Sequence, residues 1–224
     1  MTKLDVHNRA RRIFDPFVTA LAAIGVPPIL VSLSGLALSL YGASVVADGG
    51  LALGGLFLLL AGLCDILDGD LARRRGSTSP FGAFIDSTID RITEFAYFGG
   101  IILYVVNRPA GFHDFEVAVV IVALAGSVLT SYARARAEGV GVECKVGLME
   151  RPERILLLAA GLFLGYHVLR VVMTILAVTS MLTFVHRMIH VYRSARHMPA
   201  IPTNGQVPSP PSAGGTTQTT AAGK

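Results

Sequence analysis

Residues 51–94 read LALGGLFLLLAGLCDILDGDLARRRGSTSPFGAFIDSTIDRITE, an apolar run that continues into a cluster of acidic residues. The run from Gly49 to Cys64 carries no charge and leads into Asp65 without a turn signal. Six of the chain's 15 acidic residues then fall between positions 65 and 94. A carboxylate at membrane depth costs several kcal/mol unless it is paired or hydrated. The stretch therefore predicts membrane helices whose acidic residues share a compensating partner.

The composition of the whole chain also indicates a membrane protein. Of its 224 residues, 52% are hydrophobic and 15% are charged, which excludes a disordered chain or a collagen-like fibre. Two cysteines, Cys64 and Cys144, are too few for a disulfide scaffold and do not indicate an oxidising compartment. The net charge of +4 does not indicate nucleic-acid binding, because the basic residues lie between long apolar runs.

The apolar runs predict an all-α integral membrane protein with six transmembrane helices. A run from Ile155 to Val185 would be ~46 Å long as one helix, against a hydrocarbon core of ~30 Å, so we divide it at Gly165–His167. The helix of the third span is expected to begin before its apolar run, because the same helical pattern extends from Phe95 back to Asp86. The apolar runs of the first four spans are 29–47, 49–64, 95–106 and 117–133.

The N-terminal segment is predicted to be an amphipathic helix at the membrane surface. Apolar residues recur there at three- and four-residue steps between basic ones. We expect this helix to start again at Asp15–Pro16, with Asp15 as cap; the alternative is a basic cytoplasmic tail. The chain thus divides into an interfacial segment (1–27), a six-span domain (28–197) and a disordered tail (198–224) of mainly Pro, Gly, Ser, Thr and Ala.

The basic residues predict the orientation of the spans. Of the 19 Lys and Arg, all but three fall on one side of a six-span chain. The exceptions are Arg91, within a span, and Arg108 and Arg170 on the other side. Basic residues favour the cytoplasmic side, which places both termini and the acidic cluster on the cytoplasmic face of the inner membrane.

Four of the acidic residues are candidate metal ligands. Asp65 and Asp68 share one helix face, as do Asp86 and Asp90, and a short loop makes their two helices antiparallel. Four converging carboxylates need cations between them, and oxygen ligands favour Mg²⁺ or Mn²⁺. A purely structural helix pair, neutralised by Arg73 and Arg91, is the alternative, but it leaves the acids outnumbering the arginines.

The pattern Asp65-x2-Asp68-Gly69-x2-Ala72-Arg73-x8-Gly82-x3-Asp86-x3-Asp90 resembles the signature of the CDP-alcohol phosphotransferases at all eight fixed positions. The resemblance implies a metal-dependent enzyme that transfers a phosphatidyl-type group from a CDP-linked lipid and releases CMP. It implies two bound Mg²⁺ or Mn²⁺ ions and a general base at Asp90, and family members are commonly homodimers. The implied metal ligands are Asp65, Asp68, Asp86 and Asp90, and the implied nucleotide-binding residues are Asp65, Asp68, Gly69, Ala72, Arg73 and Gly82.

The residues around two basic segments, 131–138 and 150–154, are similar to those of phosphatidylinositol-phosphate and archaetidylinositol-phosphate synthases. This likeness implies a phosphorylated polyol, inositol 1-phosphate, as acceptor, with glycerol 3-phosphate as the alternative. In the actinobacterial members of that subfamily lysine stands where this chain has Arg134, which keeps the charge but changes the geometry. The candidate acceptor-phosphate residues are Arg134, Lys145, Arg151, Arg154 and Arg187. CDP-diacylglycerol and CDP-archaeol both remain open as donor.

A function of another class is a metal or proton transporter that uses the intramembrane carboxylates. The sequence shows no internal repeat and no matching pair of broken helices, and its acids gather at one membrane face. These features favour the enzyme.

Overall fold

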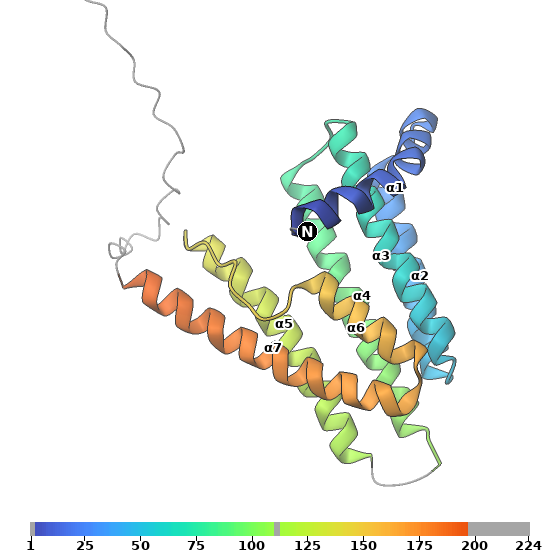
Figure 1. Cartoon of the computed structure of the whole chain (residues 1–224), viewed down its shortest axis with the longest axis vertical. Coiled ribbons are helices and arrows are strands. Elements are labelled where there is room, and N and C mark those ends of the chain that lie inside the picture. Colours follow the sequence, from blue (N-terminus) through green and yellow to red (C-terminus); the bar gives the residue numbers. More distant parts are fainter. Residues whose placement is uncertain (1–2, 110–112, 197–224) are drawn as a thin grey trace, which may run out of the picture.

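The computed structural model describes residues 3–109 and 113–196, which form seven α-helices and no strand (Figure 1). The tail predicted for 198–224 lies outside the described residues. The helices are α1 (Lys3–Ile24), α2 (Pro28–Ala47), α3 (Leu51–Arg74), α4 (Pro80–Val106), α5 (Asp114–Gly139), α6 (Arg151–Phe163) and α7 (Tyr166–Ala195).

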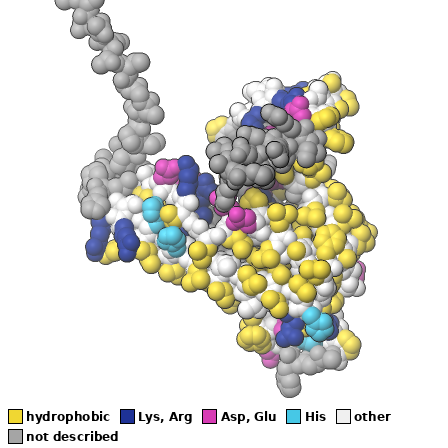
Figure 2. Space-filling model, viewed as in Figure 1, with side chains coloured by type: hydrophobic (Ala, Val, Ile, Leu, Met, Phe, Trp, Pro, Cys, Tyr) yellow, Lys and Arg dark blue, Asp and Glu magenta, His cyan; other side chains and the backbone are white. Residues whose placement is uncertain are grey.

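The helices are those of a membrane-embedded protein. Four of them, α2, α3, α5 and α7, are long and apolar enough to cross a bilayer. The helix α6 has 13 residues, a length of ~20 Å, and α4 carries several charges. By length and composition, therefore, the multi-span prediction is supported but the number six is not reached. Figure 2 shows hydrophobic side chains over the middle of one face and charged side chains and histidines at its lower end.

The predicted break in the long apolar run is confirmed. Helix α6 ends at Phe163 and α7 begins at Tyr166, with Gly165 between them at φ +87°. An L side chain rarely adopts this conformation, so glycine permits the reversal. Helices α6 and α7 pack against each other, and α6 also packs against α3 and α7 against α5.

The predicted restart of the N-terminal helix at Asp15–Pro16 is wrong. One helix runs from Lys3 to Ile24 with Pro16 inside it, and Asp15 forms an ion pair with Arg74 at the end of α3. Arg74 also donates a hydrogen bond to the Thr19 hydroxyl (2.9 Å). These contacts hold α1 against the end of α3 and offset the hydrogen bond that proline removes. The next helix, α2, starts at Pro28.

The core is built on close crossings between α2, α3 and α4. Helix α2 packs against both α3 and α4. Tyr97 of α4 is almost fully buried and donates a hydrogen bond to the carbonyl of Gly54 on α3 (2.9 Å). At Gly100 the helix backbone lies against the backbone of Ala43 on α2. Small residues allow such close helix packing in membranes, and here they set the relative position of the helices that carry the acids.

Gly100→Ala is expected to lower the thermal stability of the protein. A Cβ at this position would overlap the carbonyl oxygen of Ala43, so α2 and α4 would have to separate. Overpacking of this kind costs about 1–3 kcal/mol. Gly99→Ala is the matched control, since a Cβ there meets no atom within 4 Å. Thermal unfolding in detergent, followed by circular dichroism, compares the two, and equal midpoints would show that the crossing tolerates the methyl group.

Candidate active site

Three carboxylates meet between the end of α3 and the start of α4. Asp65, Asp68 and Asp86 each offer one oxygen, and these oxygens lie within 4.8 Å of one another. Such a set of carboxylate oxygens suits a hard divalent cation such as Mg²⁺ or Mn²⁺. The predicted convergence of the two helices is therefore confirmed for three of the four acids.

Asp90, the fourth predicted acid, lines the same cavity as the other three but has a cationic partner. Its Oδ1 lies 2.5 Å from Nη2 of Arg151, and its Oδ2 lies 3.9 Å from Nη2 of Arg91. It thus stands where the acidic cluster meets the basic residues of α6.

The start of α4 explains how Asp86 and Asp90 reach this cavity. Ser79 caps the helix by accepting a hydrogen bond from the backbone N–H of Gly82 (3.0 Å), and Pro80 takes the first helical position. An added Cβ at Gly82 would come 3.2 Å from the Ser79 hydroxyl oxygen. Gly82 therefore leaves room for the cap. The cap sets where the helix begins, and so the turn on which each aspartate lies.

The remaining predicted nucleotide-binding residues follow Asp68 on α3. Gly69 lies beside the guanidinium of Arg73, where a Cβ would make an ordinary contact at 3.5 Å. Ala72 is half-buried, and Arg73 is exposed and pairs with Asp70 at 2.5 Å. Arg73 thus pairs with an aspartate outside the metal-spaced set.

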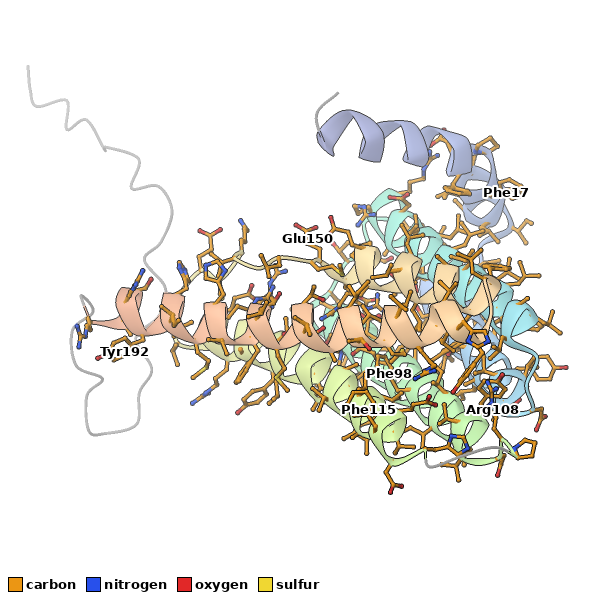
Figure 3. The ribbon with its side chains drawn as sticks, turned by 60° about the horizontal axis from the view of Figure 1, so that its bottom comes forward. Phe17, Phe98, Arg108, Phe115, Glu150 and Tyr192 are labelled. Carbon is orange, nitrogen blue, oxygen red and sulfur yellow. The ribbon has the colours of Figure 1, made fainter. Side chains whose placement is uncertain are left out.

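Two of the five predicted acceptor residues contact the acids. Arg151, the first residue of α6, pairs with Asp90 and lies 3.5 Å from Asp65 Oδ2. One turn later Arg154 is 8% exposed, and its Nη2 lies 3.8 Å from Glu94 Oε1. The start of α6 is capped by Glu153, which accepts a hydrogen bond from the backbone N–H of Glu150 (2.8 Å). Figure 3 shows Glu150 toward the same end of the bundle as Phe17 of α1, with Arg108 and Phe115 at the opposite end.

The other three predicted acceptor residues have different partners. Arg187 of α7 is buried and donates hydrogen bonds to the carbonyls of Thr130 (2.6 Å) and Val146 (2.8 Å), which holds the segment before α6 against α5 and α7. Arg134 and Lys145 are exposed and pair with Glu138 and Glu143, respectively. Within the described residues, none of the three forms an ion pair with the four aspartates.

Sequence reasoning missed Ser32 of α2, which donates a hydrogen bond to Oδ2 of Asp68 and lines the aspartate cavity. In the sequence, the only signal for Ser32 is that it is a polar residue within an apolar run. It also missed Ser127 of α5, which donates to Glu94. Glu94 also accepts a hydrogen bond from Arg91 of its own helix (2.7 Å). Both serines are brought in by tertiary packing across 33 or more residues of sequence.

A separate cavity of about 220 Å³ lies at the other end of the bundle, between α4, α5 and α7. Glu116 there accepts a hydrogen bond from the Tyr166 hydroxyl (2.5 Å) and pairs with Arg170 (2.8 Å). None of the predicted site residues lines this cavity.

The family model of the CDP-alcohol phosphatidyltransferases matches residues 16–185, which contain the whole acidic cluster and most of the bundle. The chain belongs to the CDP-alcohol phosphatidyltransferase family. It is therefore an enzyme of this class, and the family signature seen in the sequence is confirmed. The membership argues against the transporter alternative.

Curated relatives within the family share a narrower activity. The chain is 35% identical over 187 residues to the archaetidylinositol phosphate synthase of Methanothermobacter thermautotrophicus, covering 82% of this chain and 90% of the relative. It is 37% identical over 197 residues to the phosphatidylinositol phosphate synthase of Streptomyces avermitilis, covering 82% and 80%.

Solved structures of a third relative share the fold. The crystal structure of the Mycobacterium tuberculosis phosphatidylinositol phosphate synthase with CDP-DAG bound matches at a TM-score of 0.77 and 32% identity, covering 85% of this chain and 100% of that one. The structure of the same enzyme in complex with manganese and citrate matches at 0.73 and 33% identity, covering 79% and 88%.

Proposed function

We propose that this CDP-alcohol phosphatidyltransferase joins the phosphatidyl-type group of a CDP-linked lipid to inositol 1-phosphate, with release of CMP. The observation that carries the proposal is that the acidic residues and a basic residue of α6 line the same cavity. Three metal-spaced carboxylates from α3 and α4 line a cavity with Asp90, and Arg151 of α6 lies in that cavity beside both Asp90 and Asp65. A donor diphosphate and an acceptor phosphate can therefore lie side by side. The names of the two curated relatives support the choice of acceptor.

The donor side consists of Asp65, Asp68 and Asp86, with Asp90 beside them. One or two Mg²⁺ or Mn²⁺ ions bound there would neutralise the diphosphate and the departing CMP. The relative whose structure holds manganese, and which also binds CDP-DAG, supports this assignment. Gly69, Ala72 and Arg73 follow Asp68 on α3, Gly82 precedes Asp86 on α4, and all four are assigned to the nucleotide.

Asp90 is assigned as the general base. The hydroxyl oxygen of the acceptor attacks the phosphorus next to the lipid, the bond from that phosphorus to the CMP oxygen breaks, and the hydroxyl proton passes to a carboxylate oxygen of Asp90. Arg151, at 2.5 Å, keeps Asp90 beside the acceptor side of the cavity.

The acceptor phosphate is assigned to Arg151 and Arg154, because guanidinium groups bind phosphate oxygens as planar forks. Arg187 supports this site from α7, since it holds the segment that leads into α6. Arg134 and Lys145 would have to leave Glu138 and Glu143 to take part.

We further propose that α2 to α7 are six spans, with α4 and α6 crossing the bilayer inside the bundle. The charges of α4 at Arg91 and Glu94 pair with each other, which lowers their cost in the membrane. Helix α1 lies at the membrane surface, the six-span unit covers 28–197, and both termini and the aspartates face the cytoplasm. A homodimer remains a prediction.

Product analysis tests this function directly. The purified enzyme is given CDP-diacylglycerol and Mg²⁺ with inositol 1-phosphate, inositol, glycerol 3-phosphate or serine, and CMP and lipid products are measured. We expect CMP release and a phosphorylated inositol lipid with inositol 1-phosphate and with none of the other three acceptors. Faster turnover with glycerol 3-phosphate would show that glycerol 3-phosphate, not inositol 1-phosphate, is the acceptor. No CMP release with any acceptor would contradict the transfer reaction with this donor.

A further inference from the structure

Glu94 is a half-buried carboxylate one helical turn beyond Asp90, and it accepts two hydrogen bonds and forms an ion pair with a second arginine. Its Oε1 accepts a hydrogen bond from Ser127, and its Oε2 accepts one from Nη1 of Arg91 (2.7 Å). Arg154 approaches Oε1 to 3.8 Å. The side chain of Glu94 is 14% exposed. Both carboxylate oxygens are therefore engaged by groups of α4, α5 and α6.

The rest of the Arg154 guanidinium has no partner within the described residues. Its Nε and Nη1 are buried without a hydrogen bond, and the hydroxyl of Ser180 on α7 is in the same state. Both residues line a cavity of about 30 Å³ together with Asp90, Glu94 and Arg151. A buried polar group without a partner costs about 1–3 kcal/mol, more if charged. A polar atom of a ligand in this cavity would remove that cost, and the space suits one water-sized group.

Arg154 also lies among like charges. Arg91, Arg151 and Arg187 all act on it electrostatically, and Glu94 is the carboxylate that offsets them. Without that offset, repulsion would push the Arg154 side chain away from its neighbours. The position of this guanidinium therefore depends on Glu94.

We infer that Glu94 is a positioning residue for the acceptor: it holds Arg154 by one edge so that the remaining N–H groups are available to the acceptor phosphate. This inference rests on the proposed function, in which Arg154 binds that phosphate. Glu94 acts through Arg154, because both of its carboxylate oxygens already face Ser127, Arg91 and Arg154. It lies outside the three-carboxylate group that suits a metal.

Glu94 could act by positioning Arg154 or only by its negative charge, and the two roles predict different results. If Glu94 only added negative charge, Glu94→Gln would make the pocket more positive and phosphate would bind more tightly. If Glu94 positions Arg154, the same change weakens binding, because a neutral amide has only one oxygen and cannot present an acceptor to both Arg91 and Arg154. Glu94→Asp keeps the charge but shortens the side chain by one methylene, so positioning predicts weaker binding there too, whereas charge alone predicts no change.

The experiment measures acceptor binding apart from turnover. Inositol 1-phosphate and, separately, inorganic phosphate are titrated calorimetrically into the Mg²⁺-loaded enzyme without CDP-lipid. We expect Glu94→Gln to weaken the binding of both by about tenfold and Glu94→Asp to weaken it less. In the CMP-release assay, KM for inositol 1-phosphate should rise equally and KM for the CDP-lipid should stay within about twofold. Glu116→Gln, a similarly buried carboxylate paired with Arg170 at the other end, is the control for folding.

A double-mutant cycle with Arg154→Gln decides whether Glu94 acts through Arg154. Adding Glu94→Gln to Arg154→Gln should produce little further loss, because the group to be positioned is already gone. Equal losses in both backgrounds, or unchanged or tighter phosphate binding in Glu94→Gln, would overturn the inference. A wild-type enzyme that releases no CMP with inositol 1-phosphate would instead overturn the proposed acceptor, and the inorganic-phosphate titration would still report on Glu94.

Discussion

Asp90→Asn is expected to lower CMP release by at least about a thousandfold while the enzyme still binds CDP-lipid. Asparagine keeps the shape of the side chain but cannot accept the hydroxyl proton of the acceptor. Asp90 is not among the three carboxylates whose oxygens gather within 4.8 Å, so the donor site should retain its ligands. The effect should therefore fall on kcat and not on the affinity for the donor.

The measurement is CMP release at saturating acceptor, with CDP-lipid binding measured separately. The acceptor must be saturating because Asp90 pairs with Arg151. The substitution releases this arginine and so can change the affinity for the acceptor. Asp48→Asn is the control, since Asp48 is an exposed residue at the α2–α3 turn, the end of α3 opposite the aspartates. Turnover above about one tenth of wild type would show that another group takes the proton.

Asp86→Asn is expected to lower the affinity for Mn²⁺ by about a hundredfold and to lower turnover by a similar factor at limiting metal. Asp86 is the only α4 member of the three-carboxylate group found in the described residues. Without it the cation would keep ligands from α3 alone, and each carboxylate contributes strongly to the affinity for a hard ion. High concentrations of Mg²⁺ should restore part of the activity.

Mn²⁺ binding is measured by calorimetry or electron paramagnetic resonance, independently of activity. Removal of metal from the wild type with a chelator should abolish CMP release, and added Mg²⁺ or Mn²⁺ should restore it. Asp114→Asn, an exposed residue in the first turn of α5, provides the control. Unchanged Mn²⁺ affinity in Asp86→Asn would place the metal elsewhere.

Much of the helical architecture could be predicted because its signals are local. A charge-free run, a glycine at a reversal and aspartates three or four residues apart all lie within a few turns of one helix. These signals predicted the division of the last apolar run at Gly165 and the meeting of Asp65, Asp68 and Asp86. The restart at Pro16 failed because a local rule was applied where a distant residue, Arg74, holds α1.

The basic side of the site was less predictable. Five residues had been assigned to the acceptor from charge and resemblance, yet only Arg151 and Arg154 contact the acids of α3 and α4. Charge along a sequence does not tell whether a side chain reaches a ligand, a backbone carbonyl or a neighbouring carboxylate. Arg187 in fact holds carbonyls, and Arg134 pairs one helical turn away on its own helix.

The sequence by itself determined that this is a helical membrane enzyme with a metal-spaced set of carboxylates, because helix periodicity and the cost of buried charge follow from residues near one another in the chain. Only the tertiary structure decided that Ser32 contacts Asp68, that Arg151 adjoins Asp90 and that Glu94 lies beside Arg154. These contacts join residues of different helices that lie 36 to 61 positions apart in the chain, and their geometry depends on how closely the helices pack at their small residues.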